Sequence, residues 1–528
     1  LNAIKGKVAG VQMANSSGAP GSDDPSINVR GITSLSAGTS PLIILDGTPF
    51  SGAMQTINTN DIESMTVLKD AASAALYGAR GANGVILITT KRAKAGDATI
   101  SLDIKLGSNS RAQQDYDYIK NPAMYYETYY QSLYNYAKDS GMNHASSSAW
   151  ANNNLFDGEY GLGYNVYTVP NGQTLIGLNG KLNPNATLGR KVSYNGAEYW
   201  LQPDKWVDAA YHNSLRQEYN LSISKGTDQN QFYFSLGYLD NEGITPQSGF
   251  KRINANLRAT TEAKSWLKIS AGARYSHYDI ESYGDEEGSS GSTANPFAAV
   301  VGIAPIYPLY IRDGQGNIMK DSNGITMYDF GGGLNAGLSR PVFGLSNAIA
   351  TGELDWAKTA GDSFSGDVSI DVKLPYNFTF TTNNVVEVFT RTGTAYSNPY
   401  YGGQASVDGS LSKSGYRAVS YTLQQIVNWS HDYGEHSVSA LAAHEYYKRT
   451  TNSVSGTKQG LFLPDASELG GYINVYSTGS AYTHYNNEGW IFRGLYDYSD
   501  RYFANLSYRR DASSRFHPKH RWGSFWSD

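Results

Sequence analysis

The chain has 528 residues, which exceeds the usual size of one globular domain and predicts either several domains or one large barrel. Its formal net charge of -5, from 42 basic and 47 acidic residues, argues against a nucleic-acid-binding surface. It has no cysteine, which excludes disulfides, thiolate metal ligands and cysteine nucleophiles in these residues, and no apolar run long enough for a transmembrane helix.

The first 95 residues are rich in Gly, Ala, Ser, Ile and Val, and Tyr77 is their single aromatic residue other than Phe50. Short strands are predicted at residues 26–32, 41–50, 64–70 and 84–92. The apolar runs in the second and fourth are continuous, as in strands that are covered on both faces. The intervening DGTP, at 46–49, predicts a turn.

Two helices are predicted between these strands. The sequence NDIES, at 60–64, predicts a short helix capped by Asn60 or Asp61. The alanine-rich stretch 69–78 predicts a helix of about two turns that ends at Gly78.

From about residue 97 the pattern changes to alternating apolar and polar residues, and the 41 tyrosines concentrate here. Antiparallel hairpins are predicted at residues 218–243, 252–278, 366–389, 421–447 and 490–511. Each hairpin closes in a few polar residues at one end, whereas the other ends lead into long connections such as 279–296 and 450–487. Strands of 9–12 residues with this asymmetry are typical of an outer-membrane β-barrel. A soluble β-sandwich or solenoid fits the same hairpins.

Residues 6–92 decide between these folds, because several motifs follow one another there: GKVAGV, SGAPG, VRGITS, PLIILDGTPF and NDIESMTVLKDAASAALYGARGANGVILITTK. This segment resembles the plug domain of TonB-dependent outer-membrane transporters of the SusC/RagA-like family. Residues 304–317 and 509–525 resemble barrel segments of that family.

The resemblance implies an all-β transmembrane fold with an N-terminal α+β plug domain in the lumen of a large antiparallel barrel of about 22 strands. Residues 1–95 would form the plug, with its start missing. Residues 96–528 would form the N-terminal and middle part of the barrel, with long extracellular loops. We therefore expect an incomplete barrel in this chain, without a TonB box or the final strands.

The positions that match the plug signature, and to which the resemblance gives a structural or gating role, are Gly31, Asp46, Gly47, Pro49, Asp61, Glu63, Lys69, Asp70, Ala74, Tyr77, Gly78, Arg80, Gly81, Asn83 and Gly84. We expect the alanine helix at 71–76 to approach the plug's own sheet closely, with Leu68, Leu76 and 85–88 as the apolar core. The polar outer residues would contact the polar wall of the barrel through hydrogen bonds and water. Solvated plug surface is the alternative for each of them.

Tyrosines recur every three to four residues at 125–138, which predicts a helix. Because tyrosine rings stack on sugars and on protein surfaces, Tyr129 and Tyr130, with Tyr400 and Tyr401 in a loop, are candidate substrate or partner contacts. Packing of this helix onto the barrel rim is the favoured alternative.

Neither a metal site nor a cofactor is expected. The histidine pairs His431/His436 and His517/His520 are expected to be solvated, and the acidic stretches 313–317 and 321–324 to be ordinary turns rather than calcium loops. No catalytic constellation is apparent, so we do not expect an enzyme.

The resemblance implies TonB-dependent active import of an oligomeric nutrient across the outer membrane of a Gram-negative bacterium, with an oligosaccharide favoured over a peptide. The implied partners are a SusD-like lipoprotein, TonB with its inner-membrane complex, and outer-membrane lipid, and a dimer of transporter–lipoprotein pairs is left open. A siderophore or cobalamin receptor is a close alternative. A surface adhesin or structural β-protein, and a glycan-degrading enzyme with paired carboxylates, are alternatives of other classes.

Overall fold

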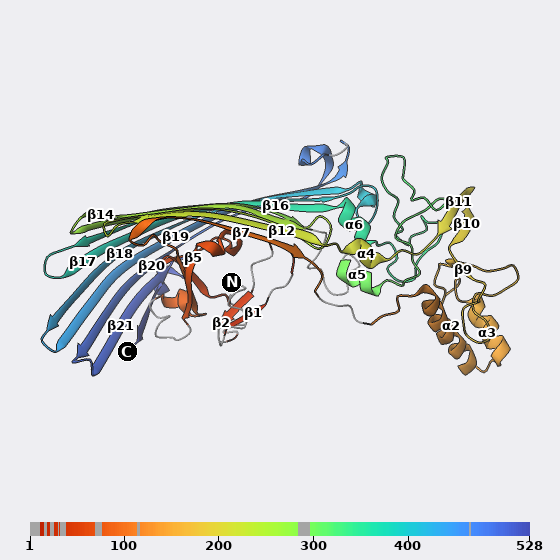
Figure 1. The fold of residues 1–528 in the computed structure, drawn as a ribbon, viewed down its shortest axis with the longest axis horizontal. Helices are drawn as coiled ribbons and strands as arrows, with labels where there is room; N and C mark the ends of the chain where they lie inside the picture. The colour runs from red at the N-terminus through yellow and green to blue at the C-terminus, as the bar shows by residue number, and fades with distance from the viewer. Residues whose placement is uncertain are drawn as a thin grey trace.

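The computed structural model describes residues 11–14, 18–21, 26–29, 31, 39–68, 77–112, 117–282, 296–463 and 466–527. They form a curved, 12-stranded antiparallel sheet, here called the large sheet, whose strands follow chain order from β7 at one edge to β22 at the other. A small N-terminal unit, residues 11–94, lies against one face of this sheet, and helices and short strands gather at one end of it (Figure 1).

The strands of the large sheet are β7 (Gly96–Asn109), β12 (Ser214–Gly226), β13 (Asn230–Glu242), β14 (Gly249–Lys264), β15 (Leu267–Ser282), β16 (Trp356–Lys373), β17 (Phe378–Ser397), β18 (Ser410–Tyr433), β19 (His436–Leu461), β20 (Tyr472–Tyr498), β21 (Tyr502–Ser513) and β22 (Trp522–Ser527). The predicted hairpins are confirmed as the pairs β12–β13, β14–β15, β16–β17, β18–β19 and β20–β21.

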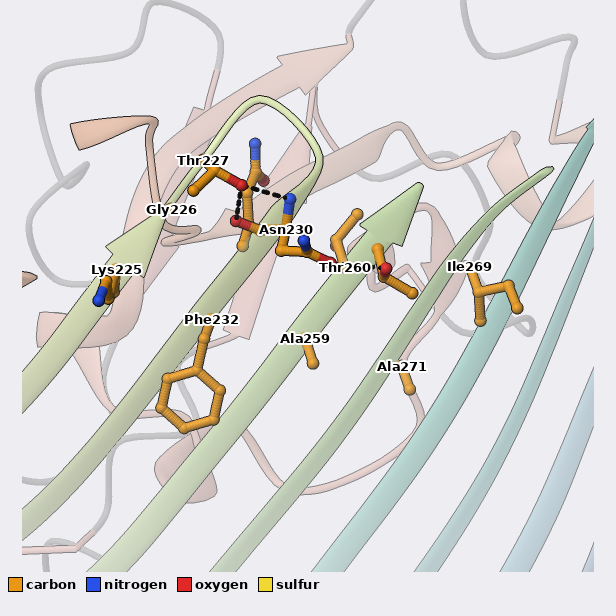
Figure 2. Close-up of a pocket in the computed structure, with 11 residues that line it drawn as sticks. Lys225, Gly226, Thr227, Asn230, Phe232, Ala259, Thr260, Ile269 and Ala271 are labelled. Carbon is orange, nitrogen blue, oxygen red and sulfur yellow. Dashed lines mark hydrogen bonds between the residues drawn. The ribbon is translucent and has the colours of Figure 1, made fainter. Parts of the chain in front are cut away.

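Alternation gives the large sheet an apolar outer face and a polar inner face. On β7, Ile100 and Leu106 belong to a row of outward apolar side chains that are 52–71% exposed. On β13, Phe232 points outward, whereas its neighbour Tyr233 is buried on the inner face. Figure 2 shows Phe232 and the outward alanines of β14 and β15 on adjacent strands. This pattern is the one expected of a barrel wall with lipid outside and polar groups inside.

The connections between the strands alternate in length. The short turns are residues 227–229, 265–266, 374–377, 434–435 and 499–501. The longer connections are residues 110–213, 243–248, 283–355, 398–409, 462–471 and 514–521. Because antiparallel strands return to the same side every second connection, all short turns lie at one end of the sheet and the longer connections at the other. The predicted asymmetry is confirmed.

Several strands are longer than predicted. β18, β19 and β20 have 24, 26 and 27 residues, whereas a tilted bilayer crossing needs about 10. The prediction of a long loop at 450–487 is therefore wrong, because β19 continues to Leu461 and β20 starts at Tyr472. Both faces of β20 are exposed there, so its sequence lacks the regular alternation of apolar and polar residues that marks a half-buried strand.

The N-terminal unit contains β1 (Val11–Ala14) paired with β2 (Ser26–Val29), and a sheet of β3 (Leu42–Leu45), β4 (Thr48–Pro49), β5 (Ile62–Leu68) and β6 (Val85–Thr90). The sheet order is β4-β3-β6-β5, with β3 and β6 parallel. Its core contains Ile44, Val85, Ile86 and Ile88, with Leu68 packed at its edge. The predicted position of residues 85–88 in the core of the unit is confirmed.

Two predictions for this unit need comment. The short helix predicted at 60–64 is wrong: a 3-10 turn, Thr59–Asp61, leads directly into β5. Its cap is Asn58, whose side chain accepts a hydrogen bond from the Asn60 amide, so the turn starts earlier than the sequence indicated. The alanine helix at 71–76 lies outside the described residues. Two further 3-10 turns are Met54–Thr56 and Gly78–Gly81.

The connections 110–213 and 283–355 fold together into what is here called the loop unit. Its elements are α2 (Pro122–Asp139), α3 (His144–Asn153), β8 (Tyr167–Thr168), β9 (Thr187–Leu188), β10 (Arg190–Tyr194), β11 (Ala197–Leu201), α4 (Trp206–Ala210), α5 (Pro296–Gly302) and α6 (Ala348–Leu354). The predicted tyrosine helix is confirmed as α2, which starts at the cap Asn121. Among the described helices, none combines the length and hydropathy needed to span a bilayer.

Candidate functional site

The surface where the N-terminal unit meets the inner face of the large sheet gathers most of the buried charge of the chain (Figure 1). The N-terminal unit presents turns and loop ends to it rather than its apolar core. Its contacts fall into several groups, which follow the large sheet from β7 toward β21.

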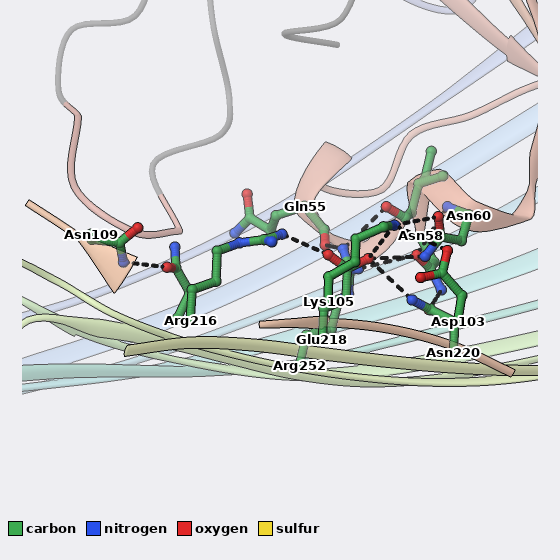
Figure 3. A network of polar contacts seen from close by, with 12 residues as sticks. Gln55, Asn58, Asn60, Asp103, Lys105, Asn109, Arg216, Glu218, Asn220 and Arg252 are labelled. Carbon is green, nitrogen blue, oxygen red and sulfur yellow. Dashed lines mark hydrogen bonds and ion pairs between the residues drawn. The ribbon is translucent and has the colours of Figure 1, made fainter. Parts of the chain in front are cut away.

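The first group joins the turn that precedes β5 to the wall strands β7 and β12, as Figure 3 shows. The side-chain amide of Asn58 donates to Asn220 Oδ1 at 2.8 Å, and the side-chain amide of Asn60 donates to Glu218 Oε1 at 2.9 Å. Lys105 Nζ donates to Asn60 Oδ1 at 3.1 Å and lies 3.7 Å from the Glu218 carboxylate. Each polar side chain of the unit here has a wall residue as its partner.

The second group surrounds the buried Asp61. Its carboxylate accepts hydrogen bonds from the hydroxyls of Tyr233, at 3.1 Å, and Ser235, at 2.5 Å, both on β13. Burial raises the pKa of Asp61, although these hydroxyls act in the opposite direction. On the next strand, Arg252 donates to the backbone carbonyls of Gln55 and Ile57 at 2.9 and 3.1 Å. Charged and hydroxyl groups of the wall thus hold the turn that precedes β5.

The third group is an ion cluster around Asp46, in the turn between β3 and β4. Asp46 accepts from the backbone amide and the hydroxyl of Thr90, at 2.9 and 2.8 Å, which fixes the carboxylate within the unit. It also forms ion pairs with Arg258 at 3.1 Å and Arg274 at 2.5 Å. Asp367 on β16 lies 3.2 Å from Arg258 and balances the second cation.

Burial alone would raise the pKa of Asp46, whose side chain is only 4% exposed. The two arginines and the two Thr90 hydrogen bonds outweigh that effect and hold the pKa below its ordinary value. Asp46 is therefore a buried anion whose stability depends on cations supplied by the wall.

The remaining groups reach the later strands. Ser51 donates its hydroxyl to Glu387 on β17 at 2.8 Å, lies 3.1 Å from the Ser420 hydroxyl on β18, and accepts from Arg449 on β19 at its carbonyl.

Arg80 forms an ion pair with Glu445 on β19, which Arg509 on β21 also contacts at 3.3 Å. The Arg80 guanidinium lies 5.0 Å from the centre of the Tyr447 ring. Such a cation–π contact adds to the ion pair without requiring a shared apolar core.

Among the described residues, the hydrophobic clusters of the N-terminal unit contain residues of the unit and none of the wall. Polar contacts between two preformed surfaces can be exchanged for contacts with water at a lower cost than opening a hydrophobic core. The arrangement therefore fixes the unit in place while leaving its own core intact if the contacts are broken.

The other signature positions are placed as follows. Gly31, Gly47 and Gly84 have φ values of 95°, 90° and 88°, a conformation that favours glycine. Tyr77 packs against the cluster of Ile44 and Val85.

Pro49 belongs to β4, and Gly78 and Gly81 bound a 3-10 turn. Glu63 pairs with the exposed Lys94 at 3.8 Å, and the Asn83 side chain donates to the Ser40 carbonyl at 3.4 Å.

Lys69, Asp70 and Ala74 lie outside the described residues. The gating role of the signature positions remains a prediction.

The candidate tyrosines mainly pack the loop unit. Tyr130 is 2% exposed and donates to the Ser148 hydroxyl at 2.7 Å, so its ring lies in the core of the loop unit. Its role as a ligand contact remains a prediction. Tyr129 is half-buried and donates to the Tyr160 carbonyl. Tyr401 stacks on Phe330 in the core of the loop unit.

Tyr400 is half-buried, and its backbone amide donates to the Asn398 side chain at 3.0 Å.

The acidic turns are built as turns. One Asp313 oxygen accepts from the backbone amides of Gln315 and Asn317, and Asp321 accepts likewise from two amides. These oxygens already have donors, which leaves them poor cation ligands. Across the ranges that the structure describes, no group of three or more His, Cys, Asp or Glu side chains could hold a metal ion.

The sequence analysis missed the wall partners of the plug, chiefly Arg258, Arg274, Glu387 and Glu445. A signal was present, since charged and polar residues at inward positions alternate with the outward apolar series on β14, where Arg252 precedes Ile253 and Arg258 follows Leu257. It named no partner, because the contacts join positions hundreds of residues apart.

Residues 1–85 match the family model described as the TonB-dependent Receptor Plug Domain. The chain is 26% identical to TonB-dependent receptor P39 of Formosa agariphila, over 99% of this chain and 43% of that protein. It is 24% identical to TonB-dependent receptor SusC of Bacteroides thetaiotaomicron, over 99% of this chain and 46% of that protein. The chain thus spans about half the length of the curated relatives it matches.

Among solved structures, the RagAB peptide transporter matches with a TM-score of 0.73 and 20% identity, over 99% of this chain and 55% of that chain. The ferric citrate transporter FecA matches with a TM-score of 0.50 and 9% identity, over 100% of this chain and 56% of that chain. The plug match, the curated relatives and the shared fold support a SusC/RagA-like TonB-dependent transporter with a plug and part of its barrel. The predicted fold is confirmed.

Proposed function

We propose that the complete protein imports an oligomeric nutrient across the outer membrane of a Gram-negative bacterium, with TonB supplying the pull that displaces the plug. The observation that carries this proposal is the plug–wall interface. Buried ion pairs and hydrogen bonds hold the N-terminal unit against the inner face, while its apolar core stays separate. A unit attached in this way blocks the passage at rest and can be displaced without unfolding.

The substrate class rests on the family resemblance. An oligosaccharide is the leading candidate, because the plug motifs resemble those of the SusC-like branch. A peptide is the second, since the matching RagAB structure is that of a peptide transporter. A SusD-like lipoprotein over the extracellular end is the proposed partner, and the loop unit offers it a large folded surface at the long-connection end of the sheet.

Locking the plug to the wall tests the moving-plug mechanism. The hydroxyls of Ser51 and Ser420 lie 3.1 Å apart across the interface, and the 528 residues contain no cysteine to interfere. We expect the double variant Ser51→Cys/Ser420→Cys to form a disulfide that stops uptake under oxidising conditions, with uptake restored by a reductant. Each single variant is the control.

Uptake by cells should be measured with labelled oligosaccharides and peptides, in the presence and absence of TonB. Import that continues through the verified disulfide contradicts displacement of the plug. Import that is unaffected by loss of TonB, or by deletion of the transporter, contradicts the proposed function itself. Uptake of peptides alone would select the second substrate class.

A further inference from the structure

The outer face of the large sheet has a groove near the short-turn end, with a volume of about 520 Å³. Phe232 on β13, Ala259 on β14 and Ala271 on β15 lie in one row across it, and Ile269 lies nearer the turns (Figure 2). The alanines leave the depression because their neighbours in the row, Phe232 and Val368, are large. The volume is within the range of small-molecule sites, about 300–1,000 Å³.

One end of this groove is polar. Lys225 is exposed and pairs with Phe232 in the same outward row, so its ammonium group stands at the rim of the apolar floor. Asn230 and Thr227 continue the rim toward the turn (Figure 2). An apolar floor with a cation at one end is complementary to an amphiphile with an anionic head.

The position of the groove relative to the membrane narrows the choice of amphiphile. Trp266, in the neighbouring short turn, is 51% exposed, and exposed tryptophans favour the level of lipid headgroups. Short turns face the periplasm in outer-membrane barrels. The groove is also continuous with the apolar outer face that contacts lipid, so a lipid reaches it without leaving the membrane.

We propose that the groove seats one acyl chain of a phospholipid from the periplasmic leaflet, with the lipid's anionic phosphate beside Lys225. This inference rests on the outer-membrane location that is part of the proposed function. The alanines make room for the acyl chain, whereas Lys225 determines which headgroup is preferred. Substitutions at the alanines and at Lys225 should therefore change occupancy and headgroup preference separately.

The test is native mass spectrometry of the full-length protein in mild detergent, titrated with phosphatidylglycerol and phosphatidylethanolamine. We expect one tightly held phospholipid per chain. The variant Ala259→Leu/Ala271→Leu fills the groove and should reduce its occupancy by about tenfold, because methylenes of the acyl chain lose contact with the wall. Ala273→Leu, on the same face of β15 but outside the groove, is the matched control and should bind as the unmodified protein does.

Lys225→Gln should abolish the preference for phosphatidylglycerol, whereas Lys225→Arg should keep it. Undiminished occupancy in the double alanine variant, an equal loss in Ala273→Leu, or recovery of lipopolysaccharide or a peptide instead of phospholipid would each overturn the assignment. Lipid occupancy is measured independently of uptake. Failure here with normal TonB-dependent uptake therefore rejects the groove and leaves the transport proposal standing.

Discussion

Replacing Asp46 by Asn should weaken the attachment of the plug to the wall more than any surface change in the same unit. The substitution keeps the shape of the side chain but leaves Arg258 and Arg274 without the anion between them. Removing one partner of a buried ion pair typically costs about 3–5 kcal/mol. Asp367 remains 3.2 Å from Arg258 and compensates in part, so we expect the lower end, about 3 kcal/mol.

Hydrogen–deuterium exchange of the purified full-length protein measures this loss of free energy at the turn that carries residue 46. The backbone amides of residues 46–48, in the turn that carries Asp46, exchange when that turn opens. A loss of about 3 kcal/mol should accelerate their exchange by roughly 100-fold. Glu63→Gln is the matched control. Its carboxylate belongs to the same unit, and its one ion pair among the described residues is with the exposed Lys94, so we expect a change of less than about fivefold.

A second variant separates the contact with the wall from the contact within the unit. Arg274→Met removes a wall cation and leaves the hydrogen bonds from Thr90 to Asp46 in place. Faster exchange of the amides of residues 46–48 in both variants is the expected result. Unchanged exchange in Arg274→Met, or equal acceleration in Glu63→Gln, would refute the idea that the wall arginines hold this turn.

Three further predictions concern pH, packing and backbone strain. The pKa of Asp46 in the docked unit is below its ordinary value of 3.8, so its contribution to docking should be complete above that pH and be lost as the pH falls toward the lowered value. Exchange of the amides of residues 46–48 in acid measures this loss, and protection that does not change with acid would contradict it. Tyr130→Ala should destabilise the loop unit by about 3–5 kcal/mol, seen as exchange of α2, and a loss of ligand binding at unchanged stability would contradict its packing role. Gly84→Ala should destabilise the unit more than Gly47→Ala in thermal unfolding, since both have positive φ but only at Gly84 would the new methyl lie 2.9 Å from Val29; equal shifts would exclude the steric cause.

The sequence predicted the parts of the fold that local patterns control. Period-two alternation located the hairpins, and the continuous apolar runs located β3 and β6, because strand burial on one or two faces leaves those patterns in the chain. The alternation disappears in β20 before Asn487, where both faces of the strand are exposed. The prediction of a long loop at 450–487 failed for this reason. The cap at Asn58 was missed for a related reason, since several neighbouring polar residues could have served.

The candidate site was less accessible to sequence reasoning. Asp46, Asp61 and Arg80 were identified through motifs, but their partners come from the barrel wall and carry no local signal. Tyr130 shows the opposite difficulty: a stripe of tyrosines has the same spacing whether the rings bind a ligand or fill a core. Only the packing of α2 against α3 and the rest of the loop unit shows that the Tyr130 ring lies in a core.

The contacts of the N-terminal unit are spread along the wall: Asn60 contacts β12, Asp46 contacts β14 and β15, Ser51 contacts β17, and Arg80 contacts β19. This unit precedes the wall strands in the chain and carries docking groups for several of them. It can serve as a template during biogenesis, on which each arriving strand finds its counter-charge. Without it, Arg258 and Arg274 would face each other across the growing cylinder with Asp367 as their remaining anion in the cluster.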